Sequence, residues 1–566
     1  MEKQLEYLNY KNNRFYKENI KELDFVLKTQ LKNTELWNKF ISVFQTKEDS
    51  EDLGWRGEYF GKMMRGACMV FSLVGDTELY SILTDCIEKM LAQQDEFGRI
   101  SSYDVANEFT GWDVWCRKYV LVGFEYFYGI CSDAALKNRV LLSLKKQADY
   151  IISKIGVNGK NILETSDAYG GVNSSTILEP ILKLYSLTGD KKYINFTKYI
   201  IEQGGCKFGN LIEYAQTRYP DEYPETKAYE TISFFEGVFD FGIATKNKFY
   251  INTAKKFADD LYLREITVVG GIGCHCEVFN NAALTQTEES GFLMQETCVS
   301  VTWLRFISKL YSYFKDIKYQ DWIEKTYLNV MRGSVNTEGY RFFSVERNEF
   351  VAPLAFDSYS PITSDVRGRA ISGYKEFKSG GFYSCCSAIG AAGIAAFYLN
   401  AFIKEGRDFI VNQYIGGEYS FSAANGKTVN VILKTHYPFN GKIHIEVLSD
   451  TNDFRIKFRI PEWCSEAYLK TQNGIIKCEK GYFIAEGGLL TAGESVLDFS
   501  MPVVKIELNG KYAYRKGPCV LAQSEDMSDR KKFKFGSEVL DLCEYSFCGK
   551  KNLSVMPKIN VWFKDV

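Results

Sequence analysis

Apolar residues recur at helical intervals through the first 400 residues of the chain, as they do at Ile177, Ile181 and Leu184. The helical segments are interrupted by turns of similar sequence, at 74–76, 131–133, 188–190, 246–247 and 315–316. Successive turns lie 57, 57, 57 and 69 residues apart, so each repeat can hold about two helices and their connections. Because the loops before some of the expected inner helices are rich in Trp, Tyr, Glu and Lys, a closed ring fits better than an open solenoid. We therefore predict an (α/α)6 barrel.

After about residue 405 the period of the pattern changes to two. Four segments alternate apolar and polar residues between turns rich in Gly, Asn and Asp, namely 409–414, 429–433, 443–447 and 454–460. This alternation is typical of strands and predicts a β-sandwich, in which Asn425-Gly426 and Asn440-Gly441 would form tight turns. From about residue 506 the pattern is weaker, although Ala513–Pro518 is typical of a strand that enters a turn.

The length of the chain indicates more than one domain. A chain of 566 residues exceeds what one ordinary core organises, and its 46% apolar content supplies material for several. We predict a multidomain α+β protein with an (α/α)6 barrel over residues 1–404, a β-sandwich over 405–505 and a β-rich C-terminal extension over 506–566.

The charges nearly cancel, with 69 Lys and Arg against 71 Asp and Glu and a net charge of −2. No Lys/Arg-rich run stands out, so we expect neither nucleic acid nor an anionic membrane as a partner, and a ligand that is small or uncharged. Met1–Glu6 contains no apolar export segment, and no stretch approaches the roughly 18 apolar residues of a membrane-spanning helix. We expect a cytoplasmic protein. Its oligomeric state is left open, with a homodimer as one alternative.

Two adjacent cysteines, Cys385 and Cys386, and an upstream Glu296-Thr297-Cys298 triplet offer three thiolates and one carboxylate, in a chain with only three histidines. Such ligands suit a tetrahedral Zn²⁺ ion without imidazole. Without an export signal, the 15 cysteines are expected to be reduced thiols. Because 87 residues separate the two halves and there is no second CxxC, buried bystander cysteines remain the alternative. Side chains at i and i+2 diverge on a helix, so Glu296 and Cys298 can share an ion only where the backbone leaves the helix.

The longest repeat contains a glycine-rich segment, Val269–Glu277, which is unsuited to helix. Functional loops often occupy such insertions. Its Cys274-His275-Cys276 run can itself offer metal ligands, but the adjacent Glu277 and the stronger downstream set favour a loop that positions Glu277.

Five short motifs follow one another along the chain: Gly57–Lys62, Gly270–Gly273, Glu296–Cys298, Cys385-Cys386 and the sandwich motif Arg459–Trp463. Together they resemble the β-L-arabinofuranosidase family, glycoside hydrolase family 127, and the neighbouring family 146. Each motif is short, but their order and the helical-then-β layout extend the resemblance over nearly the whole chain. The resemblance implies an (α/α)6 barrel with a zinc site, a retaining mechanism, a zinc-bound cysteine nucleophile and a glutamate acid/base.

By this resemblance, Cys385 matches the nucleophile, and Glu296, Cys298 and Cys386 match its companion zinc ligands. Glu277, which follows the glycine-rich loop, matches the acid/base. The chemistry agrees with the residues themselves, because zinc lowers the pKa of a thiol and a protonated carboxyl can assist a departing oxygen. In this arrangement the sulfur replaces one member of the carboxylate pair that retaining enzymes usually hold about 5 to 5.5 Å apart.

The chain departs from the family pattern at two places. Many members continue the cysteine pair with Pro-Pro-Asn, whereas this sequence reads Ser387–Gly390. The barrel histidine near the Trp-x-x-x-Cys stretch is replaced by Lys118-Tyr119. Residues expected to face the ligand change while the metal residues persist, so the identity of the substrate is open.

A group of charged and aromatic residues clusters at the starts of alternate expected helices: Glu58, Tyr103, Trp112, Lys118, Tyr119, Lys227 and Glu230. Core packing or a solvent-exposed charge would explain each of these residues taken singly. Together they favour sugar contacts, because aromatic faces stack on C–H surfaces and charged groups hydrogen-bond to hydroxyls. The segment 170–175 is predicted to form a helix N-cap and not to contact the substrate directly. His436 and His444 lie in the predicted sandwich and are expected to be structural.

The sequence therefore favours a zinc-dependent retaining glycoside hydrolase that removes a terminal furanose, with β-L-arabinofuranose as the first candidate, from short oligosaccharides or glycosides. One alternative is another plant-cell-wall sugar, such as a branched acidic deoxypentose of pectin whose carboxylate would meet Lys118 or Lys227. A second alternative is a sugar-binding protein with a structural zinc and no turnover. Barrel-fold epimerases are disfavoured because they use histidine acid/base pairs and this barrel holds only His275.

Overall fold

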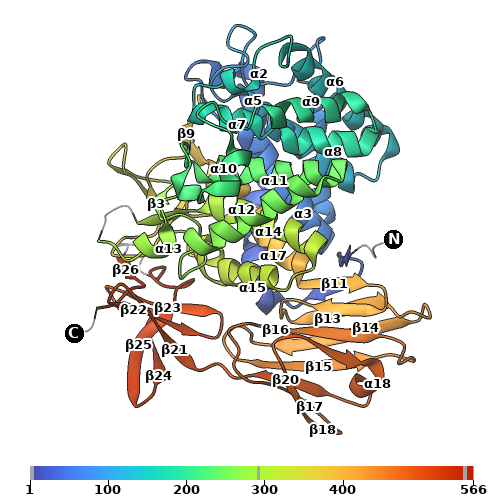
Figure 1. Ribbon diagram of the computed structural model, residues 1–566, viewed down its shortest axis with the longest axis vertical. Coiled ribbons are helices and arrows are strands. Elements are labelled where there is room, and N and C mark those ends of the chain that lie inside the picture. The colour runs from blue at the N-terminus through green and yellow to red at the C-terminus, as the bar shows by residue number, and fades with distance from the viewer. Residues whose placement is uncertain (1–4, 290–292, 552–556, 565–566) are drawn as a thin grey trace.

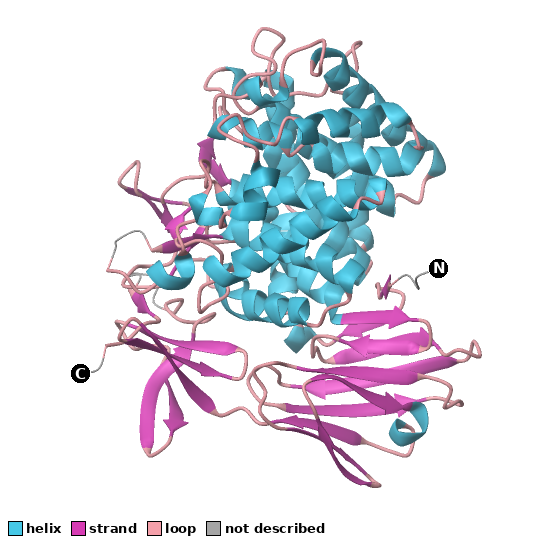
Figure 2. Cartoon of the chain, in the orientation of Figure 1, coloured by secondary structure: helices cyan, strands magenta, loops and turns pink. Residues whose placement is uncertain are grey.

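A closed ring of six inner helices forms the largest part of the protein. Figures 1 and 2 show this helical part above the β-rich regions. The computed structural model describes residues 5–289, 293–551 and 557–564. The inner helices are α3 (Glu58–Val74), α5 (Asp113–Ile130), α8 (Leu178–Thr188, preceded by the short α7, Val172–Ser175), α11 (Ala228–Thr245), α14 (Thr297–Phe314) and α17 (Cys385–Ala401). The last of these, α17, packs against both α14 and α3, which closes the ring and confirms the predicted (α/α)6 barrel.

Outer helices return along the outside of the ring. They are α4 (Thr77–Leu91), α6 (Ala134–Lys154), α9 (Lys191–Glu202), α12 (Lys248–Arg264) and α15 (Lys318–Thr326), with α1 (Lys21–Val26) beside α17 and α2 (Thr34–Thr46) beside α3 and α4. The short helices are α10 (Leu211–Thr217), α13 (Ala282–Thr285), α16 (Arg332–Ser334), α18 (Gly487–Leu490), five 3₁₀ turns (Lys17–Asn19, Glu48–Ser50, Ile162–Glu164, Tyr169–Gly171, Pro220–Glu222) and two π turns (Leu27–Leu31, Tyr327–Met331) among the described residues.

The repeated turns of the sequence lie where an inner helix ends and its outer partner begins. Gly75 and Gly189 end α3 and α8 in the left-handed conformation, which glycine adopts without strain. Asp76 and Asp133 then accept a hydrogen bond from the backbone of the next helix and cap its first turn. The spacing in the sequence is therefore the length of one helical hairpin.

Long non-helical segments interrupt the ring on both sides of α14 and α15. They contain three small sheets, with the strand orders β3-β4-β7, β6-β5-β8 and β10-β9. The strands are β3 (His275–Cys276), β4 (Met294–Glu296), β5 (Phe342–Ser344), β6 (Glu349–Val351), β7 (Tyr359–Pro361), β8 (Arg369–Ala370), β9 (Tyr374–Glu376) and β10 (Phe382–Ser384). Because β4 runs directly into α14 and β10 into α17, these segments cover the N-terminal mouth of the ring.

A β-sandwich follows the barrel, as the period-two pattern predicts. One sheet has the order β1-β11-β12-β16-β19 and the other β18-β17-β20-β15-β14-β13-β2. The strands are β1 (Glu6–Tyr7), β2 (Asn13–Phe15), β11 (Phe402–Glu405), β12 (Asp408–Val411), β13 (Gly417–Ser422), β14 (Thr428–Thr435), β15 (Lys442–Leu448), β16 (Arg455–Ile460), β17 (Ala467–Thr471), β18 (Gly474–Cys478), β19 (Gly481–Glu486) and β20 (Ser495–Phe499). Two edge strands, β1 and β2, come from the start of the chain, which the sequence did not indicate.

The two predicted tight turns of the sandwich differ in outcome. Asn425 and Gly426 lie in the short turn between β13 and β14, where Gly426 has a φ of +81°. Asn440 and Gly441 instead end a longer connection, residues 436–441, which contains a cis peptide bond between Tyr437 and Pro438. The second prediction is wrong, because the chain between β14 and β15 must reach back to the barrel, where the Tyr437 hydroxyl donates to Glu324 at 2.5 Å.

A third β-unit lies beside the sandwich under the barrel (Figure 1). Its strands are β21 (Val503–Leu508), β22 (Lys511–Lys516), β23 (Cys519–Ser524), β24 (Lys531–Phe535), β25 (Glu538–Glu544) and β26 (Ile559–Asn560). Val520 and Tyr545 of this unit share a buried apolar cluster with Val269 and Ile362 of the segments that cover the ring. The unit therefore packs against the segments that cover the N-terminal mouth of the ring.

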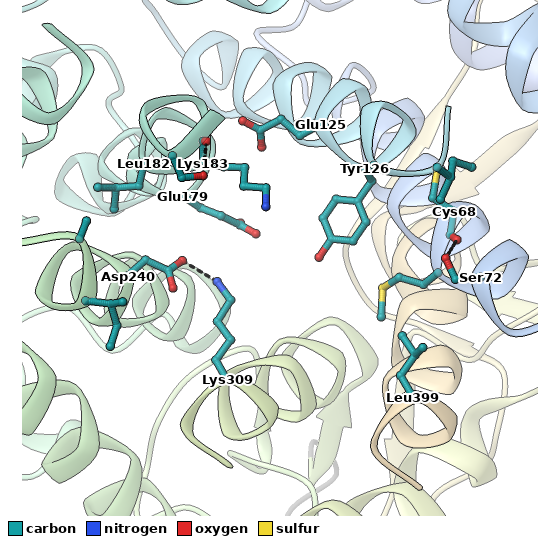
Figure 3. A pocket seen from close by; sticks show the side chains of 16 residues that line it. Cys68, Ser72, Glu125, Tyr126, Glu179, Leu182, Lys183, Asp240, Lys309 and Leu399 are labelled. Carbon is teal, nitrogen blue, oxygen red and sulfur yellow. Dashed lines mark hydrogen bonds and ion pairs between the residues drawn. The ribbon is translucent and has the colours of Figure 1, made fainter. Parts of the chain in front are cut away.

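Two cavities open at opposite ends of the ring. One lies at the N-terminal ends of the inner helices and is lined by residues such as Glu58 and Cys385. The other lies at their C-terminal ends, where Cys68 and Lys309 line it (Figure 3). Among the described residues, no helix is both long and apolar enough to cross a membrane.

Candidate active site

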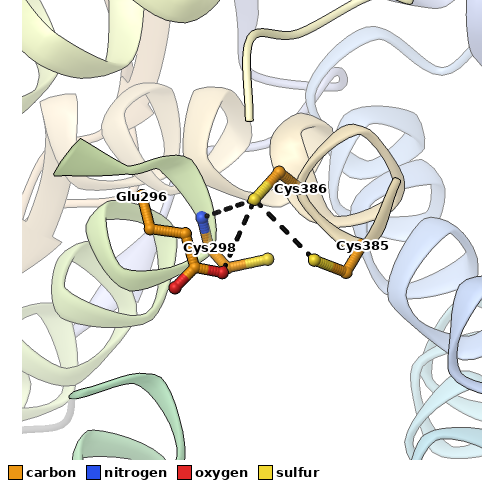
Figure 4. A group of neighbouring side chains, drawn as sticks. All are labelled: Glu296, Cys298, Cys385 and Cys386. Carbon is orange, nitrogen blue, oxygen red and sulfur yellow. Dashed lines mark hydrogen bonds between the residues drawn. The ribbon is translucent and has the colours of Figure 1, made fainter. Parts of the chain in front are cut away.

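Four buried side chains meet at the N-terminal mouth of the ring (Figure 4). Glu296 is the last residue of β4 and the N-cap of α14, with an extended backbone, and Cys298 lies in the first turn of that helix. Cys385 and Cys386 open α17. Because α14 and α17 are neighbours in the ring, their first turns bring together residues that are far apart in the sequence. The extended backbone at Glu296 is the departure from helix that a shared ion requires.

Two distances among these side chains match those between the ligands of a tetrahedral metal site. The Cys385 and Cys386 sulfurs lie 3.8 Å apart, and the Cys386 sulfur lies 3.6 Å from Glu296 Oε1. Ligand atoms at 2.0 to 2.3 Å from a tetrahedral ion are about 3.3 to 3.8 Å from one another. One ligand atom from each of the four residues lies within 4.8 Å of the others. Glu296 Oε2 is buried with no hydrogen-bond partner in the described part of the chain, so the carboxylate has a free ligand position.

The electrostatics of the cluster single out Cys385. Hydrogen bonding with the Cys298 and Cys386 side chains, together with the charge of Lys62, holds the pKa of Cys385 well below its usual value despite burial. Burial raises the pKa of Cys298 and of Cys386. The arrangement therefore stabilises a thiolate at Cys385. This sulfur also lines the cavity, whereas those of the other two cysteines do not.

Lys62 is a buried cation beside the sulfurs. Its Nζ lies 3.8 Å from Cys298 Sγ and 2.9 Å from Glu58 Oε1, and it lies 4.5 Å from the ring centroid of Tyr229. A buried ammonium needs such partners, because an unpaired charge in the interior is costly. Lys62 therefore offsets part of the negative charge that three thiolates and a carboxylate would gather.

Glu277 lies on the wall of the same cavity. It follows β3, which pairs with β4 and so aligns the glycine-rich segment with the Glu296 strand. Its carboxylate accepts hydrogen bonds from Lys227, Tyr359 and Ser372. Burial would raise the pKa of Glu277, but the Lys227 ammonium and these hydrogen bonds hold it below its usual value. Glu277 is thus ionised in the absence of a ligand.

The cavity has a volume of about 160 Å³ and an aromatic rim. Trp55, Trp112, Trp115 and Tyr169 contribute ring faces or edges to its lining. Trp112 contacts the rings of Trp55, Trp115 and Tyr169 edge to face, with centroids 5.7 to 5.9 Å apart. Aromatic rings beside carboxylates are the surface that a sugar ring uses, with C–H groups on the rings and hydroxyls on the charges.

Four of the seven predicted contact residues line this cavity: Glu58, Trp112, Lys227 and Glu230. Glu230 Oε2 is buried and has no hydrogen-bond partner in the described residues. Burial raises the pKa of Glu58 to about 7 and also raises that of Glu230. Both carboxyls are therefore able to hydrogen-bond to a neutral ligand.

The other three predicted contact residues lie behind the cavity. The Tyr103 hydroxyl donates to the Gly54 carbonyl and accepts from the Trp112 amide, so it supports the loop that carries Trp112. Lys118 donates to Ser233 at 2.6 Å, and Tyr119 hydrogen-bonds to Tyr229. Lys118 and Tyr119 lie on α5, where a shift of a few residues along the axis moves a side chain from the mouth into the core, and Tyr103 lies in the loop before α5. These three residues therefore support the cavity instead of lining it.

The sequence reasoning missed several lining residues, among them Trp55, Lys62, Trp115, Tyr169, Tyr229, Ser372 and Gly373. Helical spacing offered a signal for two of them. Lys62 stands four residues after Glu58 on one helix, and Trp115 stands three after Trp112 on the next, so each pair shares a helix face. Ser372 and Gly373 lie in a segment with no period, and nothing in the sequence marks them.

The Cys274-His275-Cys276 run forms part of the loop before Glu277. The Cys274 sulfur contacts the Asn280 and Thr285 side chains, and His275 and Cys276 form β3. None of the three belongs to a metal-type cluster among the described residues. Gly171 is the N-cap of α7, in line with the predicted capping role of this segment.

Family models match most of the chain. The model described as the beta-L-arabinofuranosidase GH127 catalytic domain matches residues 3–397, and that of the GH127 middle domain matches residues 408–483. A non-reducing end beta-L-arabinofuranosidase of Bifidobacterium longum subsp. longum is 23% identical over 415 residues, which cover 66% of this chain and 60% of that protein. The chain thus aligns with less than two thirds of that relative's length.

Solved structures share the whole fold. A GH127 beta-L-arabinofuranosidase from Geobacillus stearothermophilus T6 superposes with a TM-score of 0.71 at 17% identity, over 98% of this chain and 100% of the other. A second GH127 beta-arabinofuranosidase superposes with a TM-score of 0.72 at 16% identity, over 99% and 98% of the two chains. At this identity the likeness concerns the fold, which includes the sandwich and the C-terminal β-unit.

Proposed function

The chain belongs to glycoside hydrolase family 127 and is a glycoside hydrolase, and from this premise we propose that it is a zinc-dependent, retaining enzyme that releases a terminal β-L-arabinofuranose from short oligosaccharides. The observation that carries the proposal is the meeting of Cys385 and Glu277 in one small cavity, with three further metal-type ligands behind the sulfur. Neither the membership nor the fold alone assigns these roles.

Zinc fits the donor set of Glu296, Cys298, Cys385 and Cys386, and when bound it would keep the sulfurs deprotonated and fixed in position. The remaining chemistry belongs to the side chains. Cys385 is the first residue of α17, and its side chain lines the cavity. In the proposed complex, the anomeric carbon of the bound sugar lies next to the Cys385 sulfur.

In the first step, the Cys385 thiolate forms a bond to the anomeric carbon while the bond to the leaving oxygen breaks. The protonated carboxyl of Glu277 gives its proton to that oxygen, so the leaving group departs as a neutral alcohol. In the second step, the Glu277 carboxylate takes a proton from water, the water oxygen bonds to the anomeric carbon, and the sulfur departs as a thiolate. Two displacements at one carbon retain its configuration.

Lys227 sets the protonation state of Glu277 during this cycle. In the absence of ligand it holds the carboxylate ionised, which is the state that the second step needs. The first step needs the protonated state. A sugar that occupies the cavity excludes water and competes for the Lys227 ammonium, and both effects raise the pKa of Glu277 toward that of an effective acid.

The cavity favours a single neutral sugar. A volume of about 160 Å³ suits one pentose ring at the deepest position. Four carboxyls, Glu58, Glu230, Glu277 and Glu296, line it with only two lysines, Lys62 and Lys227. Both lysines are already paired with carboxylates, so the acidic sugar considered as an alternative has less support.

Metal analysis tests the zinc assignment. Elemental analysis of protein expressed with ample metal should find about one zinc per chain, and the Cys298→Ala variant should lose most of it. Cys274→Ala is a matched control, because its sulfur lies in the neighbouring loop but outside the cluster. Less than about 0.2 zinc per chain in the unmodified protein, or equal zinc in Cys298→Ala, would contradict the assignment.

The dependence on leaving group tests Glu277. Replacing Glu277 by Gln should slow hydrolysis of a natural glycoside by roughly 10² to 10⁴-fold, and should slow an activated aryl glycoside much less. The ratio of the two rates is the diagnostic quantity. Wild-type rates on the natural glycoside would place the acid/base role on another residue.

Covalent labelling tests Cys385. A cyclophellitol-type epoxide with the arabinofuranose configuration, followed by peptide mass mapping, should modify the peptide that contains Cys385. Nuclear magnetic resonance of the released sugar should show retained configuration at early times. Exclusive labelling of a carboxylate, or net inversion, would overturn the thiolate mechanism even if zinc were present.

A further inference from the structure

Three oxygen atoms meet at the wall of the catalytic cavity, and the proposed mechanism uses only one of them. Glu277 Oε1 accepts hydrogen bonds from the Tyr359 and Ser372 hydroxyls. The two hydroxyl oxygens lie 2.5 Å from each other, so each of the three oxygens contacts the other two. What the hydroxyls can do in the reaction depends on where the proton of Glu277 resides.

The two oxygens of the Glu277 carboxyl have different neighbours. Oε2 accepts from the Lys227 ammonium, which is a donor only and cannot accept a hydrogen bond. A proton on Oε2 would therefore face another donor. Oε1 instead faces two hydroxyls, and a hydroxyl both donates and accepts. When Glu277 is protonated, its proton is therefore favoured on Oε1.

The number of hydrogens supports this placement. Three oxygens in mutual contact form three pairs, and the two hydroxyls supply only two hydrogens. When Glu277 is ionised, both hydrogens point at Oε1, which leaves the two hydroxyl oxygens facing each other with no hydrogen between them. The proton of Glu277 supplies the third hydrogen, so that each oxygen donates once and accepts once. The group of three is thus complete in the protonated state that the first step of hydrolysis needs.

Only one of the two hydroxyl residues lines the cavity. Tyr359, on β7, is 1% exposed and lies behind the cavity wall, whereas Ser372 is exposed and forms part of that wall. Ser372 also precedes Gly373, which lies against the Cys385 sulfur. The two-residue segment 372–373 therefore contacts both the acid/base carboxyl and the attacking sulfur.

We propose that Ser372 is a further catalytic residue, which relays the proton between Glu277 and the oxygen of the leaving group. This inference rests on the proposed acid/base role of Glu277. In the first step, the bond between the anomeric carbon and the leaving oxygen breaks, and that oxygen takes the hydroxyl hydrogen of Ser372. The Ser372 oxygen takes the proton of Glu277 Oε1 at the same time. Ser372 is a neutral hydroxyl before and after, and Glu277 is left as a carboxylate.

The second step uses the same path in reverse. The water oxygen bonds to the anomeric carbon, and the water gives a proton to the Ser372 oxygen. Ser372 passes its own hydrogen to the Glu277 carboxylate, and the Cys385 sulfur departs as a thiolate. Both residues thus return to their starting states. Tyr359 touches neither the sugar nor the water in this scheme, so it is a positioning residue that holds Oε1 next to Ser372.

Rates on two leaving groups test the relay. Methyl β-L-arabinofuranoside needs a proton on its leaving oxygen, so Ser372→Ala should lower kcat/KM at least about tenfold, which is less than the loss of a whole general acid costs. The leaving group of 4-nitrophenyl β-L-arabinofuranoside departs with little protonation, so the loss there should stay below about threefold. Ser372→Thr keeps the hydroxyl and should stay within about threefold of the unmodified protein on both glycosides.

Tyr359→Phe is the matched control, because it also removes a donor to Glu277 Oε1 but lies behind the cavity wall. If Ser372 only positioned Glu277, the two variants would change the ratio of the two rates alike. The relay predicts that Tyr359→Phe changes this ratio by less than about threefold. Because Ser372 is exposed, Ser372→Ala should fold and should melt within about 2 °C of the unmodified protein.

A double variant separates failure of the relay from failure of the proposed function. Two groups that pass one proton in series act as a unit, so adding Ser372→Ala to Glu277→Gln should not slow the methyl glycoside further. Additive losses, equal losses on both glycosides in Ser372→Ala, or an equal change of the ratio in Tyr359→Phe would overturn the relay and leave the role of Glu277 intact. Wild-type rates in Glu277→Gln, or no hydrolysis of either glycoside by the unmodified protein, would overturn the proposed function and this inference with it.

Discussion

At the scale of single residues, the sulfur of Cys385 lies against a glycine across the cavity. Gly373 has a φ of +75°, and a Cβ built on it would lie 2.9 Å from Cys385 Sγ. That separation is below normal van der Waals contact, so a side chain at this position must displace the sulfur. The absence of a side chain at residue 373 thus leaves Cys385 room to face the substrate.

We therefore expect Gly373→Ala to reduce kcat/KM by about 10- to 100-fold, because misplacing a reacting group by about 1 Å costs a factor of this size. Gly380→Ala is the control. Gly380 has a φ of +84°, and a Cβ there meets no atom within 4 Å, so both variants carry the same backbone strain of about 1 kcal/mol. Steady-state kinetics should separate them. Equal activity of the two variants would argue against an attacking sulfur at Cys385.

The pair of Lys227 and Glu277 gives a second prediction at this scale. The Lys227 charge lowers the pKa of Glu277 against the effect of burial, so removing that charge should raise the pKa. The first step needs protonated Glu277, and a higher pKa preserves that form to higher pH. In Lys227→Met, the alkaline limb of the kcat/KM profile should therefore move to higher pH, whereas Lys227→Arg should leave it near its original position. An alkaline limb that moves to lower pH would contradict the role of Glu277 as the acid.

The chemistry of donor groups made part of this site predictable. Glu296, Cys298, Cys385 and Cys386 stand out in the sequence because few residue types bind zinc and histidine is scarce. Lys62 stands out less: its spacing from Glu58 indicates a shared helix face, but a lysine on an amphipathic helix normally faces solvent. Only the closed ring places its ammonium among sulfurs and aromatic rings.

At the scale of elements, local chemistry explains why the helical hairpins were predictable. A turn between an inner and an outer helix needs a residue in the left-handed conformation followed by a capping side chain, as in Gly75-Asp76 and Gly189-Asp190. Both requirements act within a few residues, so they leave a repeated signal. The strands β3 to β10 are only two or three residues long, which is too short for alternation to be detected, and tertiary pairing decides them.

Close packing of α3 on α5 gives a prediction about stability. A Cβ on Gly61 would lie 1.7 Å from the Tyr119 carbonyl oxygen, which is backbone and cannot turn aside. Gly61→Ala should therefore force the two helices apart and lower the free energy of unfolding by about 3 kcal/mol. Gly129→Ala, on α5, meets no atom within 4 Å and should be neutral or stabilising by up to about 1 kcal/mol. Thermal unfolding measures both, and a Gly61→Ala variant as stable as the unmodified protein would contradict this packing.

At the scale of the whole molecule, the barrel and the sandwich are joined in ways that sequence patterns do not reveal. The first strands of the chain, β1 and β2, pair with β11 and β13 of the sandwich, which lie about 400 residues later. Sequence separation of this size hides the pairing, because two- and three-residue strands carry no signal of their partner. The chain therefore runs from the sandwich strands β1 and β2 through the barrel and back to the sandwich.

A buried arginine forms the clearest link between these two parts. Arg459 on β16 has no exposed surface, and its guanidinium contacts Asp321 at 2.5 Å and also Glu324, both on α15. Trp463 donates to the same Glu324 at 2.8 Å. The motif from Arg459 to Trp463, one of those that carry the family resemblance, thus contacts the barrel helix α15 from the sandwich.

Replacing Arg459 by Met should therefore destabilise the whole molecule, because it leaves two carboxylates at the interface without their cation. Removing one partner of a buried ion pair costs about 3 to 5 kcal/mol. Arg455→Met is the matched control: Arg455 lies four residues earlier on the same strand and pairs with Asp408, but its side chain is 28% exposed, so its loss should cost no more than about 1 kcal/mol. Thermal unfolding followed by circular dichroism measures both variants, with limited proteolysis to reveal whether the sandwich separates from the barrel. If Arg459→Met melted at the temperature of Arg455→Met, the interface would depend on apolar packing and not on this ion pair.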